Sequence, residues 1–129
     1  MKAMHPVRAS LAAALTVVLT SVAAGALAQS GLKKADGVLA DAAGMTVYTF
    51  DKDTAGSGKS ACNGPCATMW PPVPVTEERV ASPYSVVTRE DGAKQLAYKG
   101  KPLYLFAKDT KPGERKGDKM KDVWHVVTD

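Results

Sequence analysis

The sequence predicts a mainly β protein: a small single domain of two pseudo-symmetric β-meander repeats with one or two short helical turns. Three observations predict it, namely an internal repeat, an apolar pattern with a period of two, and turn residues between the apolar runs. Residues 44–54 align without a gap with residues 100–110. The two copies share Gly44, Tyr48, Phe50, Lys52, Asp53 and Thr54 with Gly100, Tyr104, Phe106, Lys108, Asp109 and Thr110.

Residues 1–28 have the pattern of a signal peptide. Lys2 and Arg8 precede an apolar stretch, and a small-x-small exit ends at Ala28, so cleavage is expected before Gln29. The nearest cysteine is Cys62, so the thiol that a bacterial lipoprotein needs for its lipid anchor is not expected at this junction. The mature protein is therefore expected to be exported and soluble, in the periplasm or the medium, with no stable membrane span.

The mature part, residues 29–129, is long enough for one domain with a modest core. Loss of Lys2 and Arg8 lowers the formal net charge from +4 to +2, because the segment contains no acidic residue. Basic residues do cluster over residues 108–121, but acidic residues alternate with them, as in a solvated loop. Nucleic acid is therefore not an expected partner.

The elements follow from the periodicity and the turns. Repeat 1 is expected over about residues 36–72, a linker over about 73–84 and repeat 2 over about 85–127. The strands are expected over residues 38–40, 45–50, 85–90, 93–98, 101–106 and 122–127. Turns are expected at Ala43-Gly44, Asp91-Gly92 and Lys99-Gly100, because Asp-Gly supplies the backbone angles of a tight hairpin.

One short helix is expected before Trp70. Pro65 suits a first helical turn and Pro71-Pro72 would end it, which gives one or two turns over residues 65–70. A further turn could lie at residues 77–80.

Six of the eight aromatic residues belong to the repeated pattern, and a small domain is expected to use them as its core. These six are Tyr48, Phe50, Trp70, Tyr104, Phe106 and Trp124. A ligand-stacking face is the alternative. Asp53 and Asp109 follow the motif strands and are expected to bond nearby backbone amides in turns. A calcium loop in which Asp51, Asp53 and Gly56 take positions one, three and six is another alternative. That match is weak, because the twelfth position, where a carboxylate belongs, is a cysteine.

Cys62 and Cys66 are the only cysteines of the chain, and an exported location favours a disulfide between them. The alternative is redox or metal chemistry, in which Met69 and His125 complete a soft copper site. His125 is the only histidine of the mature chain and has no evident catalytic partner. We therefore expect no enzymatic activity, no catalytic residues and no cofactor.

The repeated motif also resembles that of a known family. Tyr48-Thr-Phe50-Asp-Lys-Asp53 and Tyr104-Leu-Phe106-Ala-Lys-Asp109 are similar to the Tyr-x-[Phe/Trp/Tyr]-x-x-Asp motif of a bacterial family of secreted repeats and predicted lipoproteins. The resemblance implies an extracytoplasmic location and tandem repeats, but no reaction. We therefore expect an exported, non-catalytic structural or interaction module of the periplasm or cell envelope with an unknown partner. The alternative is an extracytoplasmic copper-binding or thiol-redox protein.

Overall fold

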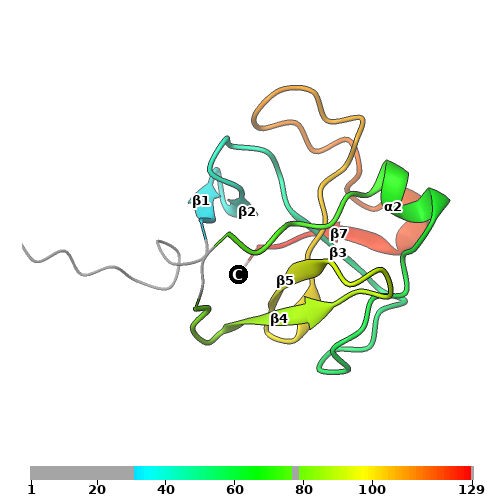
Figure 1. Cartoon of the computed structure of the whole chain (residues 1–129). Coiled ribbons are helices and arrows are strands. Elements are labelled where there is room, and N and C mark those ends of the chain that lie inside the picture. The colour runs from blue at the N-terminus through cyan, green and yellow to red at the C-terminus, as the bar shows by residue number, and fades with distance from the viewer. Residues whose placement is uncertain (1–30, 77–78, 129) are drawn as a thin grey trace, which may run out of the picture.

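The computed structural model describes residues 31–76 and 79–128, and Figure 1 shows how their elements are arranged. The predicted signal peptide lies outside these residues. The elements are β1 (Lys33–Ala35), β2 (Val38–Ala40), β3 (Tyr48–Phe50), α2 (Pro65–Met69), β4 (Tyr84–Thr88), β5 (Lys94–Tyr98), β6 (Lys101–Pro102), the 3-10 turn η1 (Met120–Asp122) and β7 (Trp124–Val126). The prediction of a mainly β domain with two repeats is confirmed.

The strands form three small antiparallel sheets, with orders β1-β2, β3-β7 and β4-β5-β6. The third is the meander predicted for the second repeat. The second sheet joins the two repeats, because β3 of the first pairs with the final strand, with Tyr48 opposite Val126 and Phe50 opposite Trp124. In Figure 1 this pair crosses the middle of the molecule between the β1-β2 hairpin and α2. The domain is therefore closed by a pairing between its two halves.

Two predicted strands are shorter than the sequence indicated. The strand expected over residues 101–106 pairs with β5 only at Lys101–Pro102, and the chain then moves to a new neighbour. Tyr104 makes isolated bridges to Tyr48 and Pro72 instead of continuing the hairpin. The strand expected over residues 45–50 is likewise regular only at Tyr48–Phe50. The 101–106 strand stops early and the 45–50 strand starts late, and both Tyr104 and Tyr48 pair with residues of the other repeat.

The ends of the described chain also differ from expectation. The strand β1 was not predicted, since its Lys33 and Lys34 are exposed and only its backbone pairing with β2 makes it a strand. The last strand begins at Trp124 because η1 occupies the residues before it.

The two predicted hairpin turns differ from each other. Lys99 and Gly100 form the expected two-residue turn, with φ angles of 53° and 85°. The turn at Asp91-Gly92 is wider, because the amide of Arg89 still donates to the carbonyl of Ala93 and only Gly92 has a positive φ. The Asp91 carboxylate accepts the Ala93 amide at 2.9 Å and stabilises this three-residue loop.

The helix α2 begins at Pro65 as predicted and ends at Met69. The helical turn suggested for residues 77–80 falls partly outside the described residues, and residues 79 and 80 are not helical.

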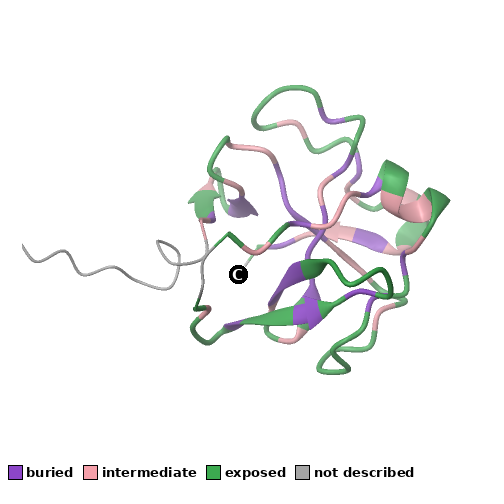
Figure 2. Cartoon of the chain, in the orientation of Figure 1, coloured by how far each residue is buried: buried purple, intermediate pink, exposed green. Residues whose placement is uncertain are grey.

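Alternate side chains of the motif strands enter two separate cores. Val47 and Leu103 join one apolar cluster with residues of β2 and β5. Tyr48 and Tyr104, both 0% exposed, join a second cluster that contains the repeated aromatic residues. Figure 2 shows buried segments on both sides of the central strands. The predicted period of two thus separates a mainly aliphatic core from an aromatic one.

Candidate functional site

The two motif tyrosines bond the motif aspartates of the opposite repeat. The Tyr48 hydroxyl donates to Asp109 Oδ2 at 2.6 Å, and the Tyr104 hydroxyl donates to Asp53 Oδ2 at 2.6 Å. The backbones of the two tyrosines also exchange hydrogen bonds, at 2.8 and 2.9 Å. Each copy of the motif is therefore completed by the other copy.

The second oxygen of each aspartate fixes the loop that follows its own motif. Asp53 Oδ1 accepts the Ala61 amide at 2.6 Å, and Asp109 Oδ1 accepts the Lys116 amide at 2.9 Å. These bonds to loop amides are the turn-organising role expected for the two aspartates. The tyrosine partners were not anticipated, although a buried tyrosine hydroxyl needs a partner.

Burial keeps both phenols protonated. Burial is the main cause that raises the pKa of Tyr48 well above its usual range, and the hydrogen bond to Asp109 raises it further. The pKa of Tyr104 is raised in the same way, first by burial and then by the hydrogen bond to Asp53. Burial also raises the pKa of Asp53, although its bond from Tyr104 acts in the opposite direction. At neutral pH the two tyrosines are therefore hydrogen-bond donors within the core.

Four aromatic rings form one continuous stack, in the order Phe50, Trp124, Trp70, Phe106. Successive centroids are 4.1, 3.7 and 4.2 Å apart, and the two indoles are within 3° of parallel. The rings come alternately from the first and second repeat. The predicted aromatic core is thus present as a stack in which both tryptophans are buried.

The two motif tyrosines pack edge-on against the tryptophans of the stack, and the backbone at Gly117 lies close to one of them. Tyr48 meets Trp70 edge-on at 5.4 Å, and Tyr104 meets Trp124 edge-on at 5.1 Å. A Cβ at Gly117 would lie 2.5 Å from Trp70 Cη2, so only glycine leaves room for the indole there. The rings are therefore fixed on several sides.

A pocket of about 520 Å³ opens beside this stack. All four stacked rings contribute to its lining. The remaining apolar lining is Pro65, Cys66, Met69, Met120 and Val123. Three lysines complete it, Lys52, Lys108 and Lys121, and none of the described residues that line it is acidic. The pocket therefore combines an aromatic wall, other apolar side chains that include two methionines, and positive charge.

The positions of two of these lysines could have been noticed in the sequence. Lys52 and Lys108 occupy the same place in the two copies of the motif, between the phenylalanine and the aspartate. Both were predicted only as matching positions of the repeat, with no role in a site. Met120 and Val123 come from the irregular segment before β7, which periodicity does not describe.

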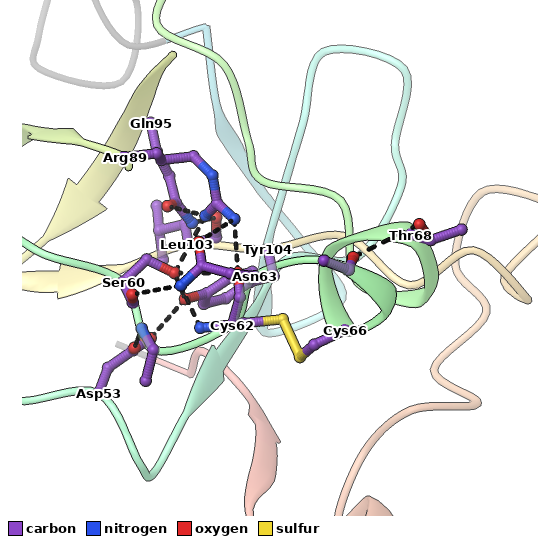
Figure 3. Close-up of a disulfide and its surroundings, with 12 residues drawn as sticks. Asp53, Ser60, Cys62, Asn63, Cys66, Thr68, Arg89, Gln95, Leu103 and Tyr104 are labelled. Carbon is purple, nitrogen blue, oxygen red and sulfur yellow. Dashed lines mark hydrogen bonds between the residues drawn. A yellow bond between two sulfur atoms is a disulfide. The ribbon is translucent and has the colours of Figure 1, made fainter. Parts of the chain in front are cut away.

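Cys62 and Cys66 form the expected disulfide, with their Cα atoms 5.2 Å apart (Figure 3). Cys62 is fully buried in the aromatic core, while Cys66 reaches the pocket from α2. The bridge therefore links the core to the helix that forms one side of the pocket.

A buried arginine that the sequence did not indicate holds the disulfide loop. Arg89 is 5% exposed and donates to Ser60 Oγ at 3.0 Å, to Gln95 Oε1 at 2.7 Å and to the carbonyl of Cys62. Ser60 Oγ also lies 2.6 Å from the Tyr104 hydroxyl, whose own proton goes to Asp53. Figure 3 shows this network beside the disulfide. It ties the loop to the motif of the second repeat.

The four residues of the copper alternative are divided between two places. Cys66 and Met69 line the large pocket, whereas His125 lines a second pocket, where its Nε2 lies 2.8 Å from Asp51 Oδ2. Asp51 therefore faces His125 while Asp53 faces Tyr104, so the two carboxylates suggested for calcium have different partners. Among the described residues, no group of three or more His, Cys, Asp or Glu side chains is placed to hold a metal ion.

Comparison with known proteins identifies the family. A family model described as a secreted repeat of unknown function matches the chain twice, over residues 32–74 and 85–128. No curated protein and no solved structure matches the chain. Within the described residues, no helix has the length and apolar character needed to cross a membrane. With both matches together spanning more than half of its length, the chain belongs to this family of secreted repeats of unknown function.

Proposed function

We propose that the protein is an exported, non-catalytic interaction module that binds its partner through the lysine-rimmed pocket. The pocket at the aromatic stack is the observation that supports this proposal. Membership of a secreted-repeat family supports export, together with the signal-peptide pattern of residues 1–28. Pockets of this size that combine apolar walls with a few charged groups are typical of ligand sites.

The chemistry of the lining favours binding over catalysis. Acid–base or nucleophilic catalysis uses a reacting group with a partner that activates it. The lining described above contains neither a carboxylate nor a histidine, and its cysteine is in the disulfide. Lysines are its only ionisable side chains, and no described acid forms an ion pair with them.

The surrounding structure supports a preformed site. The stack is fixed by both Tyr–Asp pairs, and the helix that bears Met69 is joined to the core by the disulfide. A wall that is already ordered loses little conformational freedom when it is covered, which favours binding.

Two exposed apolar residues provide a matched test. Met69 is 37% exposed at the pocket, and Val86 is 43% exposed on β4 and does not line it. The mature protein is incubated with a small-molecule extract of the cell envelope, repurified and examined by native mass spectrometry. We expect an added mass that Met69→Trp abolishes and Val86→Trp retains. Equal binding by both variants would show that the pocket is not the site.

The same sample tests the other parts of the proposal. Conversion of extract components by the protein, followed as new masses in the solution, would contradict a non-catalytic role. We expect protein isolated from the periplasm or medium to begin at Gln29, the predicted cleavage site. Intact-mass measurement checks this, and a mass that includes residues 1–28 would contradict it.

A further inference from the structure

We propose that the occupant of the pocket is an amphipathic organic anion, with an apolar body against the aromatic stack and an acidic group among the lysines. This inference rests on the proposed function and names the class of ligand. It depends on the charge of the rim, the character of the walls and the size of the space.

The positive charge of the rim is not neutralised by the aspartates beside it in the sequence. Lys52 lies between Asp51, which bonds to His125, and Asp53, and Lys108 precedes Asp109, so each lysine could have been paired locally. Both oxygens of Asp53 are instead bonded to the Tyr104 hydroxyl and the Ala61 amide. Both lysine side chains are exposed, and no described acid lies within ion-pair distance of them.

Asp109 is turned inward in the same way, by the Tyr48 hydroxyl and the Lys116 amide. The Tyr–Asp pairs therefore separate the two charges of each Lys-Asp dipeptide: the aspartate, buried at position 109 and partly buried at position 53, bonds to a buried phenol, and the lysine remains exposed at the pocket. Because this happens in both repeats, two lysines from different halves of the chain reach one space, where Lys121 joins them.

The sign of this charge decides between the ligands that an aromatic wall can accept. Tryptophan faces attract cations as well as apolar groups. Three lysines with no acid in the described lining would repel a cation and attract an anion, more strongly where water is partly excluded. The rim therefore selects an acidic group such as a carboxylate, sulfonate or phosphate ester.

Most of the pocket lining is apolar, so an anion that fills the pocket needs an apolar body as well as its acidic group. Met69 and Met120 face the space with the stacked rings, and thioether side chains adapt to irregular apolar shapes. An inorganic anion would leave these groups uncovered. A volume of about 520 Å³ is within the range of sites that enclose a small organic molecule.

Two fluorescent probes with the same body test the role of charge directly. 8-Anilinonaphthalene-1-sulfonate and N-phenyl-1-naphthylamine share the anilinonaphthalene system, but only the first carries a sulfonate. Both can be followed by energy transfer from Trp70 and Trp124, the only tryptophans of the chain. We expect the sulfonate probe to bind at least tenfold more tightly, with an affinity that falls as salt is raised.

Lysine variants assign that preference to the pocket. The double variant Lys52→Gln/Lys108→Gln should weaken the sulfonate probe about tenfold and leave the neutral probe unchanged. The control Lys33→Gln/Lys59→Gln removes the same charge from exposed lysines outside the pocket lining and should change neither affinity. All four lysines are exposed, so both variants should unfold at the wild-type urea concentration, which is measured alongside.

The possible results separate this inference from the proposed function. Equal affinity for the two probes, blocked by Met69→Trp, would retain a binding pocket and overturn the anionic ligand. An equal loss in the control lysine variant would also overturn it, because net charge alone would then explain the preference. No binding of either probe, together with no extract-derived mass, would overturn the binding module itself.

Discussion

The hydroxyl of Tyr48 lies 2.6 Å from the carboxylate of Asp109, which belongs to the other copy of its motif. The reverse bond from Tyr104 to Asp53 has the same length. The sequence motif is therefore a bonding unit only when both copies are present. The tyrosine of each copy donates a hydrogen bond to the aspartate of the other copy.

Double-mutant cycles should detect this exchange. We expect Tyr48→Phe to lower the free energy of unfolding by about 1.5–3 kcal/mol, because a buried hydrogen bond to a carboxylate is lost while the ring remains. Combined with Asp109→Asn, it should show an interaction energy above about 0.5 kcal/mol, whereas with Asp53→Asn the effects should add. Urea unfolding measures all of these variants. Coupling of Tyr48 to Asp53 rather than to Asp109 would contradict the exchanged pairing.

The same tyrosines should make the fold sensitive to alkaline pH. Burial raises the pKa of Tyr48 and Tyr104 in the folded state, whereas in the unfolded chain tyrosine ionises near 10. A folded pKa above the unfolded value means that their contribution is complete below about pH 10 and decreases as the pH rises further. We expect the urea midpoint, measured from pH 9 to 11.5, to fall once the pH exceeds about 10. The double variant Tyr48→Phe/Tyr104→Phe should lose part of this dependence, and an unchanged slope would contradict the assignment.

Truncation of the outer rings of the stack should have unequal effects. Phe106 is 5% exposed and stacks on Trp70, while Phe50 stacks on Trp124 but is only partly buried. We expect Phe106→Ala to cost about 3–5 kcal/mol, as for buried phenylalanines in general, and Phe50→Ala to cost less. Chemical denaturation checks the order. Losses below about 1 kcal/mol at both positions would mean that the rings form a surface for ligands rather than a core.

The disulfide separates the interaction module from a copper or thiol-redox protein. We expect no free thiol when the denatured, unreduced protein is labelled, and only weak copper(I) binding without stoichiometry. Replacing both cysteines with alanine should cost about 2 kcal/mol in chain entropy for so short a loop. Two reactive thiols and one tightly held copper would favour the rival. His125→Ala should not change copper affinity in either case, because His125 faces Asp51 in a different pocket.

Local pattern was sufficient for much of the fold. The alternation of Val47 with Tyr48 predicted two faces, and each face enters its own core. Pro65 marked the start of α2, and the Lys99-Gly100 turn has the two positive φ angles that a tight hairpin needs. These features depend on residues close together in the chain, where spacing and backbone preference are informative.

The features that define the site depend on contacts between distant residues. Spacing within one motif does not say which copy supplies the aspartate for a given tyrosine. Arg89 was not anticipated as a core residue, because arginines are rarely buried unless their donors are satisfied, and its acceptors come from the disulfide loop and from the neighbouring strand β5. The pocket likewise unites lysines from both motifs with residues of the irregular segment before β7.

The exchange of partners between the motifs has a consequence for how such a chain could arise. A solitary repeat leaves a buried phenol without its acceptor, a carboxylate without its donor and β3 without the strand that pairs with it. Two identical copies that face each other satisfy every one of these groups. A chain with one repeat could thus satisfy these groups by forming a homodimer, and duplication followed by fusion would preserve that interface as the interior of a monomer. Fusion would also free each half to diverge, and only the first now contains the disulfide and the loop that Arg89 holds.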